Sequence, residues 1–113
     1  MSSNFLNLYT HDFARVAIAA PVCRIADPLH NAGQTIALAE QAAAQGAALV
    51  AFPELGLSAY TCDDLFHQRA LLDGCLEALD AIVAASAQWK MALVVGAPLR
   101  VEHQLYNLSL IHI

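Results

Sequence analysis

The hydrophobic positions of the chain fall into two kinds of stretch, short unbroken runs and longer runs with helical spacing. The short runs are almost wholly apolar and predict strands of a buried sheet. They lie at residues 15–20, 47–52 and 91–95. The longer runs place apolar side chains three or four positions apart, which predicts helices. They lie at residues 29–45 and 68–88.

The last part of the chain predicts a β-hairpin. Residues 97–101 extend the third strand past Pro98, Glu102-His103-Gln104 is typical of a tight turn, and residues 105–113 form the returning antiparallel strand. The whole order of elements is that of an α/β protein. The first strand–helix–strand unit predicts a parallel pair of strands with a right-handed crossover.

Two local signals bound the first helix. Asp27 precedes Pro28 at its start, an N-cap followed by proline at the first helical position. Gly46 stands where a C-terminal cap is expected. These signals predict a helix that leads with almost no loop into the second strand.

The spacing also predicts which side of each helix is buried. On the first helix the apolar face is Ala32, Ile36, Ala39 and Ala43, whereas Asn31 falls on a polar face with three glutamines. On the second helix the apolar face is Leu72, Leu76, Leu79 and Val83, with Cys75 and Ile82 beside it.

Length and composition limit the size and the class of the protein. The chain has 113 residues, of which 58% are hydrophobic and 13% charged, enough for one modest domain. No apolar run approaches the ~20 residues that a membrane span needs, so we expect no membrane partner. Residues 1–13 carry aromatic side chains among polar ones and no signal-peptide pattern. We expect them to form an arm that packs on another surface, such as a second subunit.

Charge and cysteine content exclude several classes of function. The net charge is −5 and no basic cluster occurs, which argues against nucleic acid as a partner. The three cysteines have no paired spacing and indicate reduced thiols in the cytoplasm. The five histidines form no metal-binding pair, so we expect no metal site.

The strongest candidate for chemistry is Glu54. It follows the apolar run 47–52 and Pro53, which cannot donate to a sheet ladder and therefore ends a central strand. Ligands of open α/β sheets bind at the carboxyl ends of the strands. A carboxylate there is a candidate general base, although a solvated loop carboxylate is the simpler interpretation from position alone.

A longer set of residues carries a resemblance to a known family. The string Phe52-Pro53-Glu54-Leu55-Gly56 resembles the carbon–nitrogen hydrolase (nitrilase) superfamily. Its continuation through Tyr60 to Phe66, together with segments 13–16, 94–100 and 106–107, is similar to the glutaminase domains of the glutamine-dependent NAD synthetases. The resemblance covers roughly residues 1–107, and the tail 108–113 departs from the pattern as either a truncation or foreign sequence.

The resemblance implies a fold and a mechanism. The fold is the N-terminal part of a nitrilase-type α-β-β-α sandwich, and residues 1–113 form an incomplete domain without the synthetase domain. The family's catalytic set is a Glu, a Lys and a nucleophilic Cys, of which only the Glu maps here, onto Glu54 as general base. Tyr60 matches a tyrosine that lines the glutamine site.

The resemblance also implies a substrate, and cofactors that belong to the complete enzyme and not to this segment. Glutamine is the implied substrate, and its ammonia passes to a synthetase domain that amidates deamido-NAD with ATP and Mg. No glycine-rich phosphate loop occurs in these residues, so we expect no nucleotide or other cofactor here. The full-length protein is expected to be a homo-oligomer.

Two other residues invite a catalytic assignment that we do not make. Cys62 lies close to Glu54 in sequence, but the family places its nucleophile far downstream, so Cys62 is interpreted as a small buried residue. Lys90, the only lysine, precedes the third strand and therefore lies at the sheet end opposite Glu54 if the strands are parallel.

Two alternatives stay open. One is another carbon–nitrogen hydrolase, an amidase or nitrilase that releases ammonia freely. The other is a non-catalytic α/β module whose apolar strand edge binds a partner. The leading hypothesis, an inactive piece of a glutaminase domain, also predicts an unpaired sheet edge that promotes aggregation.

Overall fold

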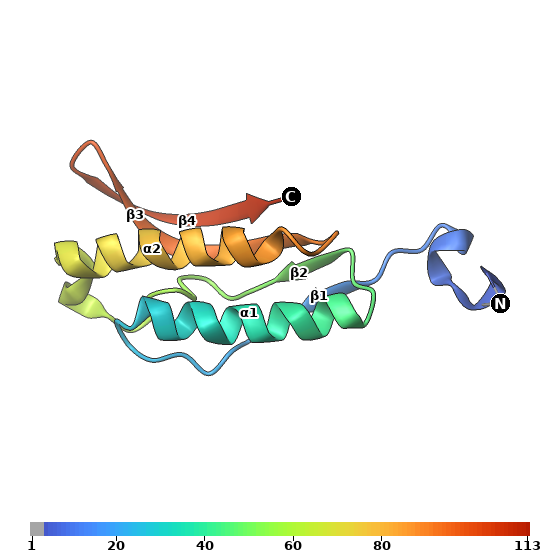
Figure 1. Cartoon of the computed structure of the whole chain (residues 1–113). Helices are drawn as coiled ribbons and strands as arrows, with labels where there is room; N and C mark the ends of the chain where they lie inside the picture. The colour runs from blue at the N-terminus through green and yellow to red at the C-terminus, as the bar shows by residue number, and fades with distance from the viewer. Residues whose placement is uncertain (1–3) are drawn as a thin grey trace.

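A computed structural model of the chain describes residues 4–113 and shows a four-stranded sheet with two long helices on one face (Figure 1). The strands are β1 (Val16–Ile18), β2 (Leu49–Ala51), β3 (Ala92–Val101) and β4 (Gln104–His112). The helices are α1 (Pro28–Ala44) and α2 (Arg69–Ser86), with short 3-10 helices η1 (Asn4–Leu6), η2 (Leu8–His11) and η3 (Asp63–His67). The predicted order of elements is confirmed.

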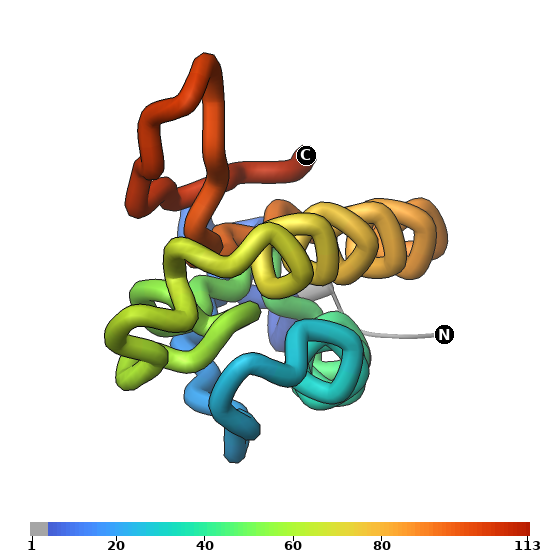
Figure 2. The backbone as a smooth tube through the Cα atoms, turned by 90° about the vertical axis from the view of Figure 1, so that its left-hand side faces the viewer, coloured from blue at the N-terminus to red at the C-terminus, as the bar shows by residue number. Residues whose placement is uncertain are grey.

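The sheet has the simplest order, β1-β2-β3-β4. Strands β1 and β2 are parallel and β4 returns antiparallel along β3, both as predicted, and β3 is also parallel to β2. The hairpin projects beyond the rest of the sheet in both views (Figures 1 and 2). Its turn is made by Glu102 and His103, which both adopt a positive φ, of 49° and 70°. A two-residue hairpin turn whose twist matches that of its strands requires a positive φ at both central residues.

The signals that bound α1 act as the sequence predicts. The Asp27 side chain accepts a hydrogen bond from the His30 N–H at 3.3 Å, and Pro28 occupies the first turn. At the other end Gly46 adopts a φ of 79°, a left-handed conformation that glycine takes without strain. Strand β2 then begins at Leu49.

The buried faces of the helices agree with the predicted ones only in part. On α1, Ala32 and Ala39 are buried, as predicted. On α2 the buried residues are Leu71, Leu72, Cys75, Ala78, Ile82 and Ser86, whereas Leu76 and Val83 are 51% and 44% exposed. Helix α2 approaches α1 closely at Gly74, where an added Cβ would lie 3.3 Å from the Pro28 ring. Asn31, predicted on a polar face, is fully buried.

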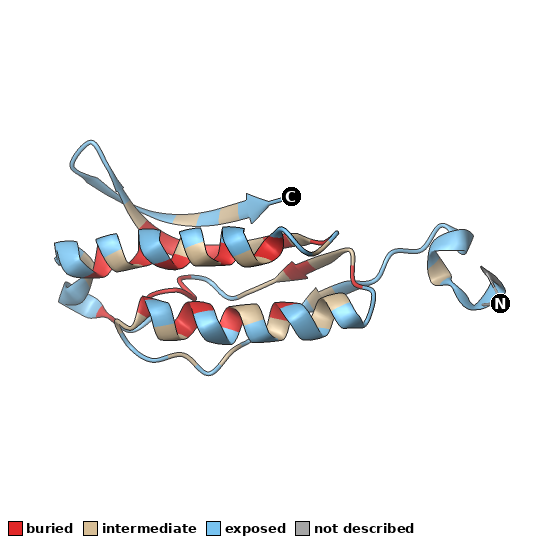
Figure 3. Cartoon of the chain, viewed as in Figure 1, coloured by how far each residue is buried: buried red, intermediate tan, exposed pale blue. Residues whose placement is uncertain are grey.

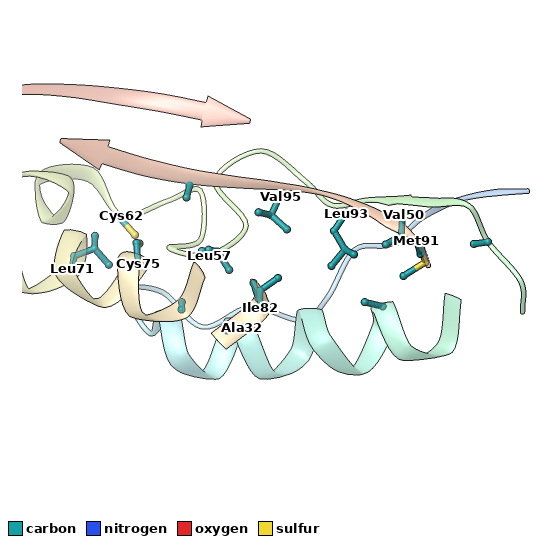
Figure 4. Packing of buried hydrophobic residues seen from close by; sticks show 14 residues of the cluster. Ala32, Val50, Leu57, Cys62, Leu71, Cys75, Ile82, Met91, Leu93 and Val95 are labelled. Carbon is teal, nitrogen blue, oxygen red and sulfur yellow. The ribbon is translucent and has the colours of Figure 1, made fainter. Parts of the chain in front are cut away.

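One face of the sheet is uncovered within the described residues. The side chains that fill the space between strands and helices are those of Val50, Leu93, Val95 and Ala97, with Leu57 and Ile82 between them (Figure 4). The strand register places Val16, Ile18 and Ile111 on the other face, where they are 65%, 90% and 66% exposed. Strand β4 is coloured exposed or intermediate in Figure 3. The prediction that the first strand is buried is therefore wrong for β1, which lies at the edge of a sheet with helices on one side only.

The N-terminal arm lies away from the body of the molecule (Figure 1). It is anchored where Tyr9 Oη donates to the Gly46 carbonyl at 2.5 Å and the Arg15 guanidinium donates to the Gln45 carbonyl. Phe5, Leu6 and Phe13 are exposed. The prediction that the arm packs on another surface stays untested, and residues 1–3 lie outside the described part. Among residues 4–113 no helix has the length and apolar character of a membrane span.

Gly96 in the middle of β3 sets how closely the segment after β2 can approach the sheet. A Cβ at Gly96 would lie 2.5 Å from Leu55 N and 2.8 Å from Pro53 O. These neighbours are backbone atoms, so no side-chain rotation relieves the contact. Only glycine lets residues 53–55 cross β3 at this distance.

The first prediction concerns this crossing. Gly96→Ala is expected to lower the free energy of unfolding by about 2 kcal/mol, because overpacking against fixed backbone forces a local shift. Gly33→Ala is the matched control. It lies in α1 with nothing within 4 Å of its new Cβ, so alanine is expected to stabilise the chain by roughly 0.5–1 kcal/mol. Urea unfolding followed by Trp89 fluorescence measures both. If Gly96→Ala and the wild type were equally stable, the close approach of residues 53–55 to β3 would be contradicted.

Candidate functional site

Glu54 lies where β2 ends and the chain turns across β3. The Phe52 N–H still donates to Val94 O at 2.9 Å, so pairing with β3 continues up to the residue before Pro53. Pro53 ends the ladder, and its carbonyl accepts from the Gly56 N–H at 3.2 Å to close a turn. Glu54 itself is exposed. The predicted position at the carboxyl end of a parallel strand is confirmed.

The residues after Glu54 are fixed from several sides. The Leu57 N–H donates to Gly96 O at 3.1 Å, and the Leu57 carbonyl accepts from Asn31 Nδ2 at 2.9 Å. Leu57 and Ser58 are buried, and Ser58 Oγ donates to the Leu55 carbonyl at 3.2 Å. Leu55 holds a φ of 52°. A non-glycine residue in this conformation persists only where its surroundings determine it, so the loop that carries Glu54 is a fixed support.

Asn31 is the buried residue that ties three segments together. Its Oδ1 accepts from the Arg24 N–H at 2.7 Å, and its Nδ2 donates to the carbonyls of Arg24 and Leu57, both at 2.9 Å. Both of its amide donors and its carbonyl oxygen are thus engaged, which offsets the cost of burying an amide. The sequence pattern predicts Asn31 on a polar, solvent-facing side of α1, because the spacing of residues gives no sign of hydrogen bonds to distant segments.

Asn107 of β4 contacts Glu54 directly. Its Nδ2 donates to Glu54 Oε1 at 2.5 Å. Both side chains line a shallow hollow of about 310 Å³. The lining residues are Phe52, Pro53, Glu54, Gly96, Asn107, Leu108 and Ser109. Sequence reasoning did not single out Asn107 for a role; its only signal was that residues 106–107 belong to the family resemblance.

Tyr60, predicted to contact substrate, is not brought to Glu54. It is 64% exposed and lines neither this hollow nor the smaller one beside it, which Leu55, Phe66, Pro98, Leu105, Tyr106 and Asn107 form. Its role in binding stays a prediction.

The three cysteines are free thiols and differ in environment. Cys62 is buried, as predicted, and its Sγ donates to the Ser58 carbonyl at 3.0 Å. Cys75 lies beside Cys62 in the core (Figure 4). Burial, with a smaller contribution from Cys62, raises the pKa of Cys75 to about 11. Burial also raises the pKa of the half-buried Cys23. A raised pKa leaves little thiolate at neutral pH, the opposite of what a nucleophile needs.

Other candidates lie away from Glu54. Lys90 lines a hollow with Tyr9, Gly46 and Met91, at the end of the sheet where β2 and β3 begin. Because these strands are parallel, it lies at the opposite end from Glu54, as predicted. The described part of the chain holds no group of three or more His, Cys, Asp or Glu side chains able to bind a metal.

The arrangement supports one chemical role. Glu54 is a carboxylate on a rigid loop, with one oxygen engaged by an amide and an open hollow in front of it. Such a group can accept a proton from a nucleophile that approaches from the open side. In residues 4–113 no thiol or lysine ammonium forms a hydrogen bond with Glu54, so the arrangement supplies a base and no nucleophile.

Comparisons with known proteins agree with this geometry. The carbon–nitrogen hydrolase family profile matches residues 15–112, so the tail that departed from the expected pattern belongs to the family up to residue 112. The glutamine-dependent NAD(+) synthetase of Mycobacterium tuberculosis is 43% identical over 108 residues, which is 96% of this chain and 16% of the relative. The chain therefore spans about a sixth of the length of the curated relatives it matches.

Solved structures share the fold. The crystal structure of a glutamine-dependent NAD(+) synthetase from Cytophaga hutchinsonii has a TM-score of 0.80 at 23% identity, over 87% of this chain and 17% of that protein. A nitrilase-superfamily amidase from Nesterenkonia has a TM-score of 0.74 at 24% identity, over 88% of this chain and 38% of the amidase. At these identities the two structures show that the fold is shared, and they do not indicate which of the two proteins this chain resembles in activity.

The second prediction concerns the thiols. In the native chain at pH 8, Cys23 is expected to react first with an alkylating reagent, while Cys62 and Cys75 react only as the core opens. A pKa of about 11 leaves Cys75 with about 100-fold less thiolate than an ordinary thiol of pKa 9. Mass spectrometry of tryptic peptides measures the three rates. Labelling in urea, where all three should react alike, is the control, and native labelling of Cys75 at its urea rate would contradict the burial.

Proposed function

Since the chain belongs to the carbon–nitrogen hydrolase family, we propose that it is the part of a glutaminase domain that supplies the general base, Glu54. The observation that carries the proposal is the carboxylate at the end of β2, held on a fixed loop and open on one side. The identity of 43% over nearly the whole chain favours a glutamine-dependent NAD synthetase over other members of the family.

In the proposed reaction Glu54 acts on groups that lie outside these 113 residues. A cysteine thiol transfers its proton to Glu54 and attacks the side-chain amide carbon of glutamine. The C–N bond of the tetrahedral intermediate then breaks, and the leaving nitrogen takes the proton from Glu54 and departs as ammonia, which leaves a thioester and a deprotonated Glu54. The covalent thioester divides a difficult amide hydrolysis into two easier steps. Glu54 then activates the water that releases glutamate, and a lysine stabilises the negative charge of the tetrahedral intermediates.

The proposal extends to the complete enzyme. Ammonia from glutamine is used by a synthetase domain for the amidation of deamido-NAD with ATP and Mg, and Tyr60 contacts glutamine in the closed site. The complete enzyme is a cytoplasmic homo-oligomer in this proposal. The three free cysteines support the assignment to the cytoplasm, because a reducing environment keeps such thiols unpaired. The exposed arm and the open sheet face support assembly with further polypeptide.

A second candidate function is an amidase or nitrilase that releases ammonia into solution. The similarity of fold to the Nesterenkonia amidase is the observation that supports it. The two candidates differ in the domain that the same reading frame would encode downstream. A synthetase domain with an SGGxDS-type phosphate loop would select the first, and its absence would select the second.

The third prediction tests the base. The 113-residue chain is expected to hydrolyse no glutamine, because it holds a base without the nucleophile. In the complete enzyme Glu54→Gln is expected to lower kcat for glutamine hydrolysis by about 10²–10⁴-fold, the usual effect of removing a general base. Glu40→Gln, the same change on the exposed side of α1, is the matched control and should leave kcat unchanged.

Ammonia release measured with a coupled assay distinguishes the outcomes. Glutamine hydrolysis by the isolated chain that is lost in Glu54→Gln would overturn the proposal that the nucleophile lies elsewhere. Full activity of Glu54→Gln in the complete enzyme would overturn the assignment of the base.

A further inference from the structure

We propose that Asn107 is a positioning residue for Glu54, whose amide occupies one carboxylate oxygen and so selects the other for proton transfer. The inference rests on the proposed function of Glu54 as the base and assigns a role to a second residue of the same site. Asn107 is separated from Glu54 by 53 positions along the chain, yet its Nδ2 lies 2.5 Å from Glu54 Oε1.

The pairing of β3 with β4 brings the two side chains together. In this register Ser109 lies opposite Gly96 and Asn107 lies opposite Pro98. Gly96 is the residue over which the chain crosses after β2, so Glu54 emerges beside this part of β4. Leu108 and Leu110 are half-buried while Asn107 and Ser109 are exposed, so alternation along β4 directs Asn107 to the same side as the hollow.

The chemistry of the amide suits this role. An asparagine side chain donates through its NH₂ group and does not exchange protons with a carboxylate near neutral pH. Hydrogen bonding to an ionised oxygen is stronger than between neutral groups, so the bond holds the carboxylate in one orientation. Oε2 then remains free for the proton of the nucleophile. Among the described residues, Glu54 is the only titratable side chain that lines the hollow, so no other acid there competes for that proton.

Because Asn107 lies on a strand, its side chain can hold the Glu54 carboxylate in a defined position. A free glutamate side chain samples many rotamers, and one bond from a residue within the β3–β4 pair restricts this sampling without covering the carboxylate. A small displacement of a catalytic group lowers the rate far more than it weakens binding of the substrate. The expected signature of Asn107 is therefore an effect on kcat with little effect on KM.

The fourth prediction has a structural and a kinetic part. In ¹⁵N-labelled 113-residue chain, the side-chain NH₂ proton of Asn107 that is hydrogen-bonded to Glu54 is expected to resonate downfield of the second proton of the same group, and Glu54→Ala should remove this displacement. The NH₂ group of Gln104, on the same strand, is the control, and its resonances should not change in Glu54→Ala. In the complete enzyme Asn107→Ala should lower kcat about 10–100-fold with KM changed less than about threefold.

Two further variants make the kinetic part specific. Asn107→Asp places a second carboxylate beside Glu54, and the acid limb of the pH–rate profile should move to higher pH because two adjacent carboxylates share a proton. Gln104→Ala removes an amide from the exposed turn end of β4 and should retain wild-type kcat and the wild-type profile.

The outcomes separate this proposal from the one it rests on. If Glu54→Gln abolishes hydrolysis while Asn107→Ala keeps wild-type kcat, the base stands and the role of Asn107 is wrong. If Glu54→Gln keeps wild-type kcat, the proposed function itself is wrong. If Asn107→Ala fails to fold, the NH₂ resonances of Asn107 in the wild-type chain decide: a downfield displacement that is lost in Glu54→Ala supports the contact, and resonances that Glu54→Ala leaves unchanged overturn it.

Discussion

The close approach of backbone to backbone at Gly96 is the constraint on which the rest of this structure depends. Residues 53–55 cross β3 where a single added carbon would lie 2.5 Å from Leu55 N. The crossing brings the Leu57 N–H to Gly96 O and its carbonyl to Asn31 on α1. Gly96 thus allows the segment after β2 to bond both to β3 and to α1, and Glu54 lies at the beginning of that segment.

Local signals were enough to predict most of the fold. Asp27-Pro28, Gly46 and the turn at Glu102-His103 each act on backbone within a few residues of themselves, so sequence reports them reliably. The predicted faces of the helices were less accurate, because spacing shows which residues are apolar and not which neighbour covers them. Leu76 and Val83 carry apolar side chains at the predicted spacing and are nevertheless 51% and 44% exposed. The exposure of Val16 and Ile18 likewise reflects what packs on β1, which no property of residues 15–20 encodes.

At the site, too, local features could be predicted from the sequence and long-range contacts could not. Pro53 and the family resemblance located Glu54, since strand termination is a local property and the motif is contiguous. The partner of Glu54 was out of reach, because the contact of Asn107 depends on the register of β3 with β4 across a turn about 50 residues later. Asn31 was misplaced for a related reason: its burial is offset by bonds to Arg24 and Leu57, which come from two distant segments.

Hydrogen exchange at the Leu57 amide is the sharpest test of whether Glu54 stands on a fixed support. Leu57 lies in a segment without regular secondary structure, so a mobile loop would leave its N–H to exchange near the rate of an unstructured peptide. The bond from this N–H to Gly96 O predicts instead that it is protected as strongly as the Phe52 N–H that pairs with β3. Exchange of Leu57 at the unprotected rate, with Phe52 still protected, would show that Glu54 stands on a flexible loop and would contradict the crossing at Gly96.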